Sequence, residues 1–225
     1  MDIVINLKRR PDRLRKFLES ARKAGLEDLV VTEAVDGKSS SFEASTHLTD
    51  AATAACWLSH VQAYNLQIEE SADYAVIFED DCDFSQVSNW GQFRNEIRQL
   101  MQQYEIDILQ LGFLEPEYSP IKRVLREVIL IMTGQALHAM KPTNGPSYVD
   151  NNFGSGAHAY VTSLRGARTL ARINNPCFLP ADGVLRFIAE SQQNYGKIKI
   201  SRLEQPVIGQ LPLSENNKSD IIGRK

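Results

Sequence analysis

The sequence lacks the features that mark disulfide-rich, membrane-spanning and nucleic-acid-binding proteins. Only three of its 225 residues are cysteine, an odd number with no Cys-x-x-Cys pair, so neither a disulfide framework nor a structural zinc site is expected. No apolar run approaches the ~20 residues that a membrane helix needs. The net charge of −3 and the pI of about 5.9 argue against general nucleic-acid binding. The amino terminus shows no basic start followed by an apolar stretch, so we expect no secretory signal and a cytoplasmic protein.

What is present predicts an ordinary globular protein of alternating strands and helices. Hydrophobic residues make up 43% and charged residues 24% of the chain, and the length suits one domain, which we expect to span residues 1–225. Ile3–Leu7 is rich in β-branched residues, Pro11 suits a helix start, Gly25 suits its end, and Leu29–Thr32 is again strand-like. A strand–helix–strand unit of this kind predicts a parallel pair of strands.

The rest of the chain continues the same alternation. We expect strands at residues 74–78, 107–111, 158–162 and 198–200, and helices from about 49, over 90–104, from about 163 and after 182. Tyr74–Phe78 is apolar enough for a central strand that is covered on both faces. Val124–Met132 is a further β-like run, and the tail from Leu211 is polar. The fold class that follows is α/β.

Acidic side chains follow the apolar strand at Tyr74–Phe78 directly. They are Glu79, Asp80, Asp81 and Asp83. Ligands of open α/β sheets bind beyond the carboxyl ends of strands, where carboxylates can hold a hard divalent cation. Alternation along an extended chain predicts that Glu79, Asp81 and Asp83 converge while Asp80 points elsewhere. The alternative is a solvated acidic turn.

Basic side chains follow the first strand, at the same expected edge of the sheet. Arg10 and Arg13 lie nearest to the strand end and to a helix amino terminus, and both features favour phosphate. A solvated basic helix face is the alternative, which we favour for Arg15, Lys16, Arg22 and Lys23. Together the two strand ends predict a nucleoside diphosphate held by a cation on one side and by arginine on the other.

Seven segments, in order along nearly the whole chain, resemble those of glycosyltransferase family 25, the lipopolysaccharide and procollagen galactosyltransferase group. They are Ile3–Leu14, Cys56–His60, Tyr74–Asp81, Asp107–Gly112, His158–Val161, Pro180–Asp182 and Ser219–Ile221. The chain departs from the family in having Thr53-Ala-Ala-Cys56 where a Gly-x-x-Gly lead is common, and in the loop after Leu111. These departures concern the acceptor side more than the donor side.

The resemblance implies a GT-A-type fold with a Rossmann-like, mostly parallel central sheet flanked by helices. It also implies a UDP-sugar donor, Mn²⁺ or Mg²⁺ and inversion at the sugar carbon. Residues 1–112 would form the nucleotide-sugar-binding half and residues 113–225 the acceptor-side half. Glu79 and Asp81 would take the places of the family's Asp-x-Asp carboxylates, with Asp81 on the metal. The remaining residues that we assign to nucleotide-sugar binding are Asn6, Arg10, Arg13, Asp36, Gly37, Ser59, His60 and Asp80.

Three further residues have both a functional and a structural interpretation. His60 would either bind substrate or satisfy a backbone carbonyl. His158 begins a strand after Gly154-Ser155-Gly156, and since glycines permit close approach of a ligand we assign it to the metal or the sugar. Inversion needs a base that takes the proton of the acceptor hydroxyl, and Asp182 is our candidate. A helix cap is the alternative for Asp182.

The expected function is a metal-dependent, inverting transfer of a hexose, by the resemblance galactose, from a UDP-sugar to a saccharide or hydroxylysine-type acceptor. One alternative is a magnesium-dependent phosphoryl-transfer enzyme that uses the same acids. Another is a non-catalytic nucleotide-sugar-binding module. The expected partners are the UDP-hexose and a glycosylatable acceptor, without nucleic acid. A basic face could also touch anionic lipid at the inner face of a membrane.

Overall fold

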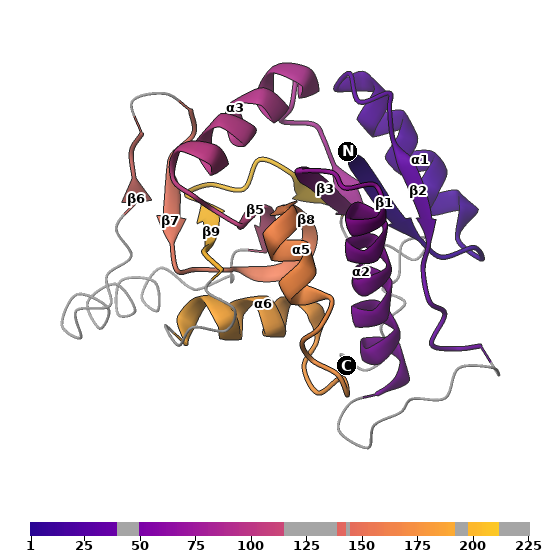
Figure 1. Ribbon diagram of the computed structural model, residues 1–225. Helices are drawn as coiled ribbons and strands as arrows, with labels where there is room; N and C mark the ends of the chain where they lie inside the picture. The colour runs from indigo at the N-terminus through magenta and orange to yellow at the C-terminus, as the bar shows by residue number, and fades with distance from the viewer. Residues whose placement is uncertain (40–49, 115–138, 143–144, 192–197, 212–225) are drawn as a thin grey trace, which may run out of the picture.

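The fold is that of a mixed sheet with helices on both faces, seen in a computed structural model that describes residues 1–39, 50–114, 139–142, 145–191 and 198–211 (Figure 1). The strands are β1 (Asp2–Asn6), β2 (Val30–Glu33), β3 (Tyr74–Glu79), β4 (Cys82–Asp83), β5 (Ile108–Leu114), β6 (Ala139–Met140), β7 (Tyr148–Asp150), β8 (Ser155–Ser163), β9 (Ile200–Leu203) and β10 (Gly209–Gln210). The helices are α1 (Pro11–Lys23), α2 (Ala51–Glu69), α3 (Trp90–Gln103), α5 (Leu164–Leu170) and α6 (Ala181–Glu190).

The chain opens with the predicted strand–helix–strand unit. Pro11 is the first residue of α1, where its missing N–H costs nothing, and Gly25 ends the helix region with a φ of +81°. Phe17 and Ala21 bury one side of α1 against the sheet. β1 and β2 pair in parallel, with Ile3 opposite Val30, so the predicted parallel pair is confirmed.

The main sheet has the strand order β2-β1-β3-β8-β5-β9-β7-β6 in the described residues. β1 is parallel to both β2 and β3, and β5 is parallel to β9, so the expectation of a mostly parallel, Rossmann-like sheet is confirmed. β8, by contrast, is antiparallel to both of its neighbours, β3 and β5. Since β8 runs the opposite way, its first residues lie at the edge where β3 and β5 end.

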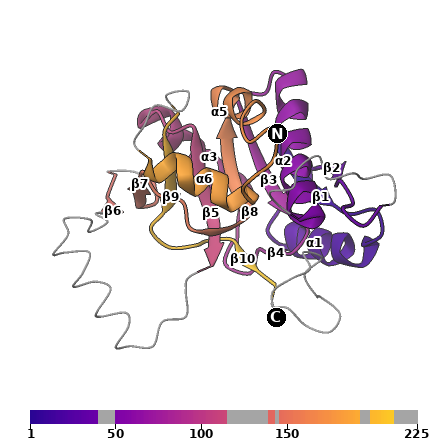
Figure 2. The ribbon, with the colours of Figure 1, turned by 90° about the horizontal axis from the view of Figure 1, so that it is seen from below.

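Two hydrophobic layers cover the sheet, one on each face. α1 and α3 pack on one face, and α2, α5 and α6 pack on the other (Figures 1 and 2). β3 contributes to both layers, because Val76 and Phe78 point into the first and Ala75 and Ile77 into the second. Its predicted central position is therefore confirmed, and its carboxyl end opens between the two layers of helices.

Several elements differ from the prediction in extent, or lie in segments where no strand was predicted. β5 extends to Leu114, and the short strands β4, β6, β7 and β10 were not expected. The β-like run at Val124–Met132 and the Ser219–Ile221 motif lie outside the described residues. Among the described helices, none is both long and apolar enough to cross a membrane. The single domain over residues 1–225, with its two halves, stays a prediction.

Candidate functional site

A cavity of about 160 Å³ opens at the edge of the sheet where β1, β2 and β3 end. Its wall combines the loop after β2, one side of α2 and the turn after β3. The predicted site residues that line it are Arg13, Asp36, Gly37, Ser59, His60, Glu79, Asp80 and Asp81. Asn6, Arg10, His158 and Asp182 are not part of this wall.

The acidic turn closes on Arg13. The Arg13 Nη2 atom lies 2.5 Å from Asp80 Oδ1 and 2.8 Å from Asp81 Oδ2, and all three side chains are largely buried. The prediction that Asp80 points away and Asp83 joins the cluster was wrong. β3 ends at Glu79 and residues 80–81 form a turn, so strict alternation no longer applies there. Asp83 instead accepts a hydrogen bond from the backbone N–H of Ser85 (3.0 Å).

The side chains of the basic segment are also arranged differently from the prediction. Asn6 donates to Asp80 Oδ2 (2.5 Å), so it holds that carboxylate rather than facing the cavity. Arg10 pairs with Asp12 in the first turn of α1, at 3.1 Å. Arg9, which the sequence analysis did not select, lines the cavity and donates to Asp36 at 2.8 Å. The basic run indicated this region, but side-chain direction at a strand end decided which arginine faces the cavity.

Burial and charge set the protonation of the acidic turn. Burial raises the pKa of Asp80 to about 7, although Arg13 and Asn6 oppose it. Burial, and then the charge of Glu79, also raise the pKa of Asp81. For Glu79, burial raises the pKa, but the hydrogen bond and charge of His60, with His158 and Arg13, lower it more, so that the pKa lies below its ordinary value. Arg13 thus offsets only part of the effect of burial on Asp80 and Asp81.

One oxygen of the acidic turn is left without a partner. Asp81 Oδ2 accepts from Gln210 (3.0 Å) as well as from Arg13, whereas Asp81 Oδ1 is buried and makes no hydrogen bond in the described part of the chain. Carboxylate oxygens are the ligands that Mg²⁺ and Mn²⁺ prefer. The unpaired oxygen and the neighbouring carboxylates of Glu79 and Asp80 therefore fit a hard divalent cation.

The raised pKa of Asp80 predicts an unusual pH dependence of stability. Its ordinary pKa is 3.8 and its folded-state pKa is about 7, so between these values the folded protein holds a proton that the unfolded chain has lost. The free energy of unfolding should therefore fall as pH rises from about 4 to about 7, by up to about 1.4 kcal/mol per pH unit from this group. Urea unfolding of Asp80→Asn in metal-free buffer should lose that slope. Asp83→Asn should keep it, and equal slopes for both variants would contradict the prediction.

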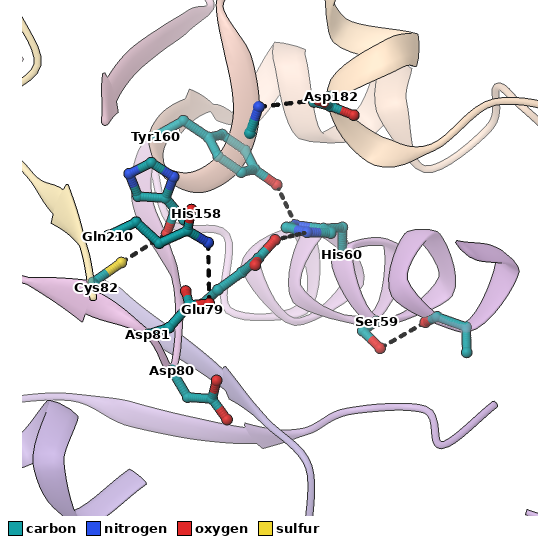
Figure 3. A network of polar contacts seen from close by, with 12 residues as sticks. Ser59, His60, Glu79, Asp80, Asp81, Cys82, His158, Tyr160, Asp182 and Gln210 are labelled. Carbon is teal, nitrogen blue, oxygen red and sulfur yellow. Dashed lines mark hydrogen bonds and ion pairs between the residues drawn. The ribbon is translucent and has the colours of Figure 1, made fainter. Parts of the chain in front are cut away.

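A buried hydrogen-bonded chain supports His60 from behind the cavity. The Tyr64 and Tyr160 hydroxyls are 2.8 Å apart. Tyr160 Oη lies 2.7 Å from His60 Nδ1, and His60 Nε2 lies 3.3 Å from Glu79 Oε1 (Figure 3). His60 therefore bonds to side chains and not to a backbone carbonyl. Tyr160 was not selected as a site residue from the sequence, because an antiparallel partner strand cannot be read from local sequence.

Ser59, the neighbour of His60, forms hydrogen bonds to backbone groups of the cavity wall. Its hydroxyl donates to the Ala55 carbonyl (2.7 Å) and accepts from the N–H of Val35 (2.9 Å). This bond attaches the loop after β2 to α2. The loop carries Asp36 and Gly37 into the wall, and a Cβ at Gly37 would lie 2.6 Å from the Ala51 carbonyl oxygen. Gly37 therefore permits close approach of protein backbone at this point.

His158 packs among glycines behind the cavity. The ring is 1% exposed, its Nε2 lies 3.2 Å from the Ile208 carbonyl oxygen, and its Nδ1 has no partner within the described segments. A Cβ at Gly112 would collide with this ring, and one at Gly156 would lie 3.2 Å from Nδ1. The close approach that Gly112 and Gly156 allow is therefore to the His158 ring itself.

Asp182 lies in the first turn of α6, at the same edge of the sheet. Its Oδ2 accepts from the backbone N–H of Gly156 at 2.9 Å. The helix-cap interpretation was wrong, because Pro180 is the N-cap residue and no side chain caps this helix. Gln110 holds the start of β8 as well, accepting from Gly154 N–H and donating to the Gly156 carbonyl, both at 2.6 Å. In the view of Figure 3, Tyr160 and His60 lie between Asp182 and the acidic turn.

Comparisons with known proteins match this chain to one family. The sequence model of glycosyltransferase family 25, described as LPS biosynthesis protein, matches residues 1–185, which include every site residue named in this subsection except Ile208 and Gln210. Among solved structures, the crystal structure of A197 from STIV is similar, with a TM-score of 0.44, 10% sequence identity, and coverage of 100% of this chain and 96% of that one. No curated protein matches.

Proposed function

The chain belongs to glycosyltransferase family 25, and from that premise we propose that it transfers a hexose, galactose in our proposal, from a UDP-sugar to an acceptor hydroxyl with inversion. The family makes it a glycosyltransferase, and the description of the family favours a saccharide acceptor of lipopolysaccharide type over hydroxylysine. We further propose that the 160 Å³ cavity binds the donor within a GT-A-type fold.

The observation that carries the proposal is the unpaired, buried Asp81 Oδ1 beside Glu79 and Arg13 at the end of β3. Asp81 and Glu79 would hold Mn²⁺ or Mg²⁺, with Asp80 kept in place by Asn6 and Arg13. When bound, such a cation would neutralise charge on the departing diphosphate. His158 lies within electrostatic reach of Glu79 and Asp81. We therefore propose that it acts on this site through its electrostatic effect on these carboxylates, and that it is a less favoured metal ligand than they are.

The remaining walls of the cavity suit the nucleoside diphosphate. Arg13 and Arg9 bring positive charge to the cavity wall, and each is already paired with an acid that a phosphate can replace. Asp36 and Gly37 form the part of the wall after β2, where we place the ribose and base. Arg10, turned toward Asp12, stays a predicted nucleotide contact that would require its side chain to reorient.

Asp182 is the proposed base. The Gly156 N–H holds Asp182 Oδ2, which leaves Oδ1 to accept the proton of the acceptor hydroxyl. The hydroxyl oxygen forms a bond to the anomeric carbon as the bond from that carbon to the diphosphate oxygen breaks. UDP leaves with the bonding electron pair, and the proton stays on Asp182 until solvent removes it. Attack from the face opposite to UDP inverts the configuration.

Thermal unfolding with UDP tests the donor site. At a UDP concentration about 100 times Kd, binding should stabilise the folded state by about 2.7 kcal/mol, which corresponds to roughly 5–10 °C in Tm for a chain of this size. We expect that rise with UDP and Mn²⁺ together and a much smaller one with UDP and a chelator. ADP with Mn²⁺ is the matched control. No rise with UDP and Mn²⁺ would reject the donor site.

Product analysis separates the proposal from its rivals. With UDP-galactose and a saccharide acceptor, a glycosyltransferase releases UDP and forms a glycoside. A phosphoryl-transfer enzyme would release inorganic phosphate, and a binding module would release neither. Contact of the basic residues of α1 with anionic lipid stays a prediction.

A further inference from the structure

We propose that Cys56, His60 and Glu79 form a second cation site in the wall of the same cavity, for a borderline-soft divalent ion such as Zn²⁺. Their ligand atoms, Sγ, a ring nitrogen and a carboxylate oxygen, all lie within 4.8 Å of one another. Zn²⁺ is commonly held by three protein ligands of these types, with a fourth position left open. The proposal rests on this geometry and does not depend on the proposed donor.

Local structure explains why these three side chains meet. Cys56 and His60 are four residues apart on α2, so they lie on the same side of the helix. Glu79 is the last residue of β3, and α2 packs on that face of the sheet. All three residues line the cavity, so an ion bound there would have its open position toward the cavity.

The distance between two of the ligand atoms already suits a tetrahedral ion. His60 Nε2 and Glu79 Oε1 are 3.3 Å apart. Two ligands that are each about 2.0 Å from a tetrahedral Zn²⁺ are about 3.3 Å from one another. Only the Cys56 sulfur needs to approach, and it would release its proton to solvent on binding.

The residues behind His60 orient it as a ligand. Its Nδ1 lies 2.7 Å from the Tyr160 hydroxyl, which directs the opposite nitrogen, Nε2, toward Glu79 (Figure 3). A metal-bound histidine typically donates its other ring N–H to an oxygen, and Tyr160 can accept it while donating to Tyr64. The ring is 1% exposed and cannot easily turn away.

Ligand chemistry separates this site from the acidic turn. Thiolate and imidazole favour Zn²⁺ and Co²⁺, whereas a set of carboxylates alone favours Mg²⁺ and Mn²⁺. Glu79 belongs to both sets. An ion on Cys56 and His60 would therefore draw Glu79 away from the acidic turn, and we expect Zn²⁺ to weaken binding of UDP with Mn²⁺.

Cobalt provides the direct test, because a thiolate bound to Co²⁺ gives a charge-transfer absorption in the near ultraviolet. Titration of the metal-free full chain should show this band at one Co²⁺ per chain, and Zn²⁺ should remove it. Cys56→Ser should abolish the band, His60→Gln should weaken binding at least about 10-fold, and Tyr160→Phe should weaken it about 10- to 100-fold. Cys177→Ser, which alters a buried cysteine elsewhere, is the matched control and should keep the band.

Two outcomes of the cobalt titration would overturn the proposal. If wild type shows no band, or if the band persists in Cys56→Ser, these residues do not hold the ion. Thermal unfolding confirms that each variant is folded before titration. The Tm rise with UDP and Mn²⁺ is measured on the same Cys56→Ser protein. Its absence in wild type as well as in Cys56→Ser would reject the donor proposal and leave the cobalt result unaffected.

Discussion

Asp81→Asn should lower the rate of sugar transfer by roughly 100- to 1,000-fold, which is the loss seen when one electrostatic contact to a transition state is removed. The substitution keeps the shape of the side chain and its bonds to Arg13 and Gln210 can persist in part, so the fold should be retained. It removes the negative charge from the only oxygen of the acidic turn that the described residues leave unpaired and buried. The measurement is steady-state release of UDP at several Mn²⁺ concentrations.

The control for Asp81→Asn is two residues away on the same segment. Asp83→Asn changes a carboxylate that bonds to Ser85 and not to Arg13, and it should retain nearly all activity. Asp81→Asn should also lose the Mn²⁺-dependent part of the Tm rise with UDP. If Asp81→Asn transfers sugar at the wild-type rate and with the same Mn²⁺ requirement, the cation does not bind at Asp81.

Asp182→Asn should lower transfer by roughly 100- to 10,000-fold while leaving donor binding unchanged, because general-base catalysis contributes about this much. The amide oxygen can still accept from the Gly156 N–H, so the start of β8 should keep its position. What is lost is a group that can take a proton. The measurement pairs turnover with the Tm rise produced by UDP and Mn²⁺, and only turnover should fall.

A purely structural role for Asp182 makes a different prediction. If the Asp182 side chain only holds the start of β8 at Gly156, the asparagine variant keeps both its activity and its pH profile. If Asp182 is the base, turnover should fall while the Tm rise with UDP and Mn²⁺ persists. Glu190→Gln, at the other end of α6, is a control that should change neither quantity. Unchanged turnover in Asp182→Asn would remove Asp182 from the mechanism.

Most of the fold could be predicted because local sequence and tertiary environment agree. The run Tyr74–Phe78 is apolar on both sides, and it is buried between two layers of helices. Pro11 and Gly25 mark the limits of α1 by conformational preferences that need no partner. Four strands, β4, β6, β7 and β10, have only two or three residues each, too few to show any periodicity. Whether such short segments form strands depends on their pairing with other strands.

The sequence predicted the candidate site only to the extent that it located the ends of the strands. Glu79, Asp81 and Arg13 follow two neighbouring parallel strands, so they had to share one edge of the sheet. Backbone turns, which have no periodic signal in the sequence, decided two further points. One is that Arg9 and not Arg10 faces the cavity, and the other is that Asp80 and not Asp83 joins Asp81.

By itself, therefore, the sequence determined the order of strands and helices, the apolar centre of the sheet and the edge where the charges gather, since these follow from side-chain polarity and spacing along the chain. Only the tertiary structure decided that Arg13 lies directly between Asp80 and Asp81, that Tyr160 supports His60, and that Cys56 and Glu79 meet at the same wall. The physical reason is that hydrogen bonds and ion pairs act over about 3 Å, so they require side chains from distant segments to be placed in space. The antiparallel β8 does this for Tyr160, which pairs with Ile77 of β3 and lies beside His60, although the two residues are 100 positions apart in the sequence.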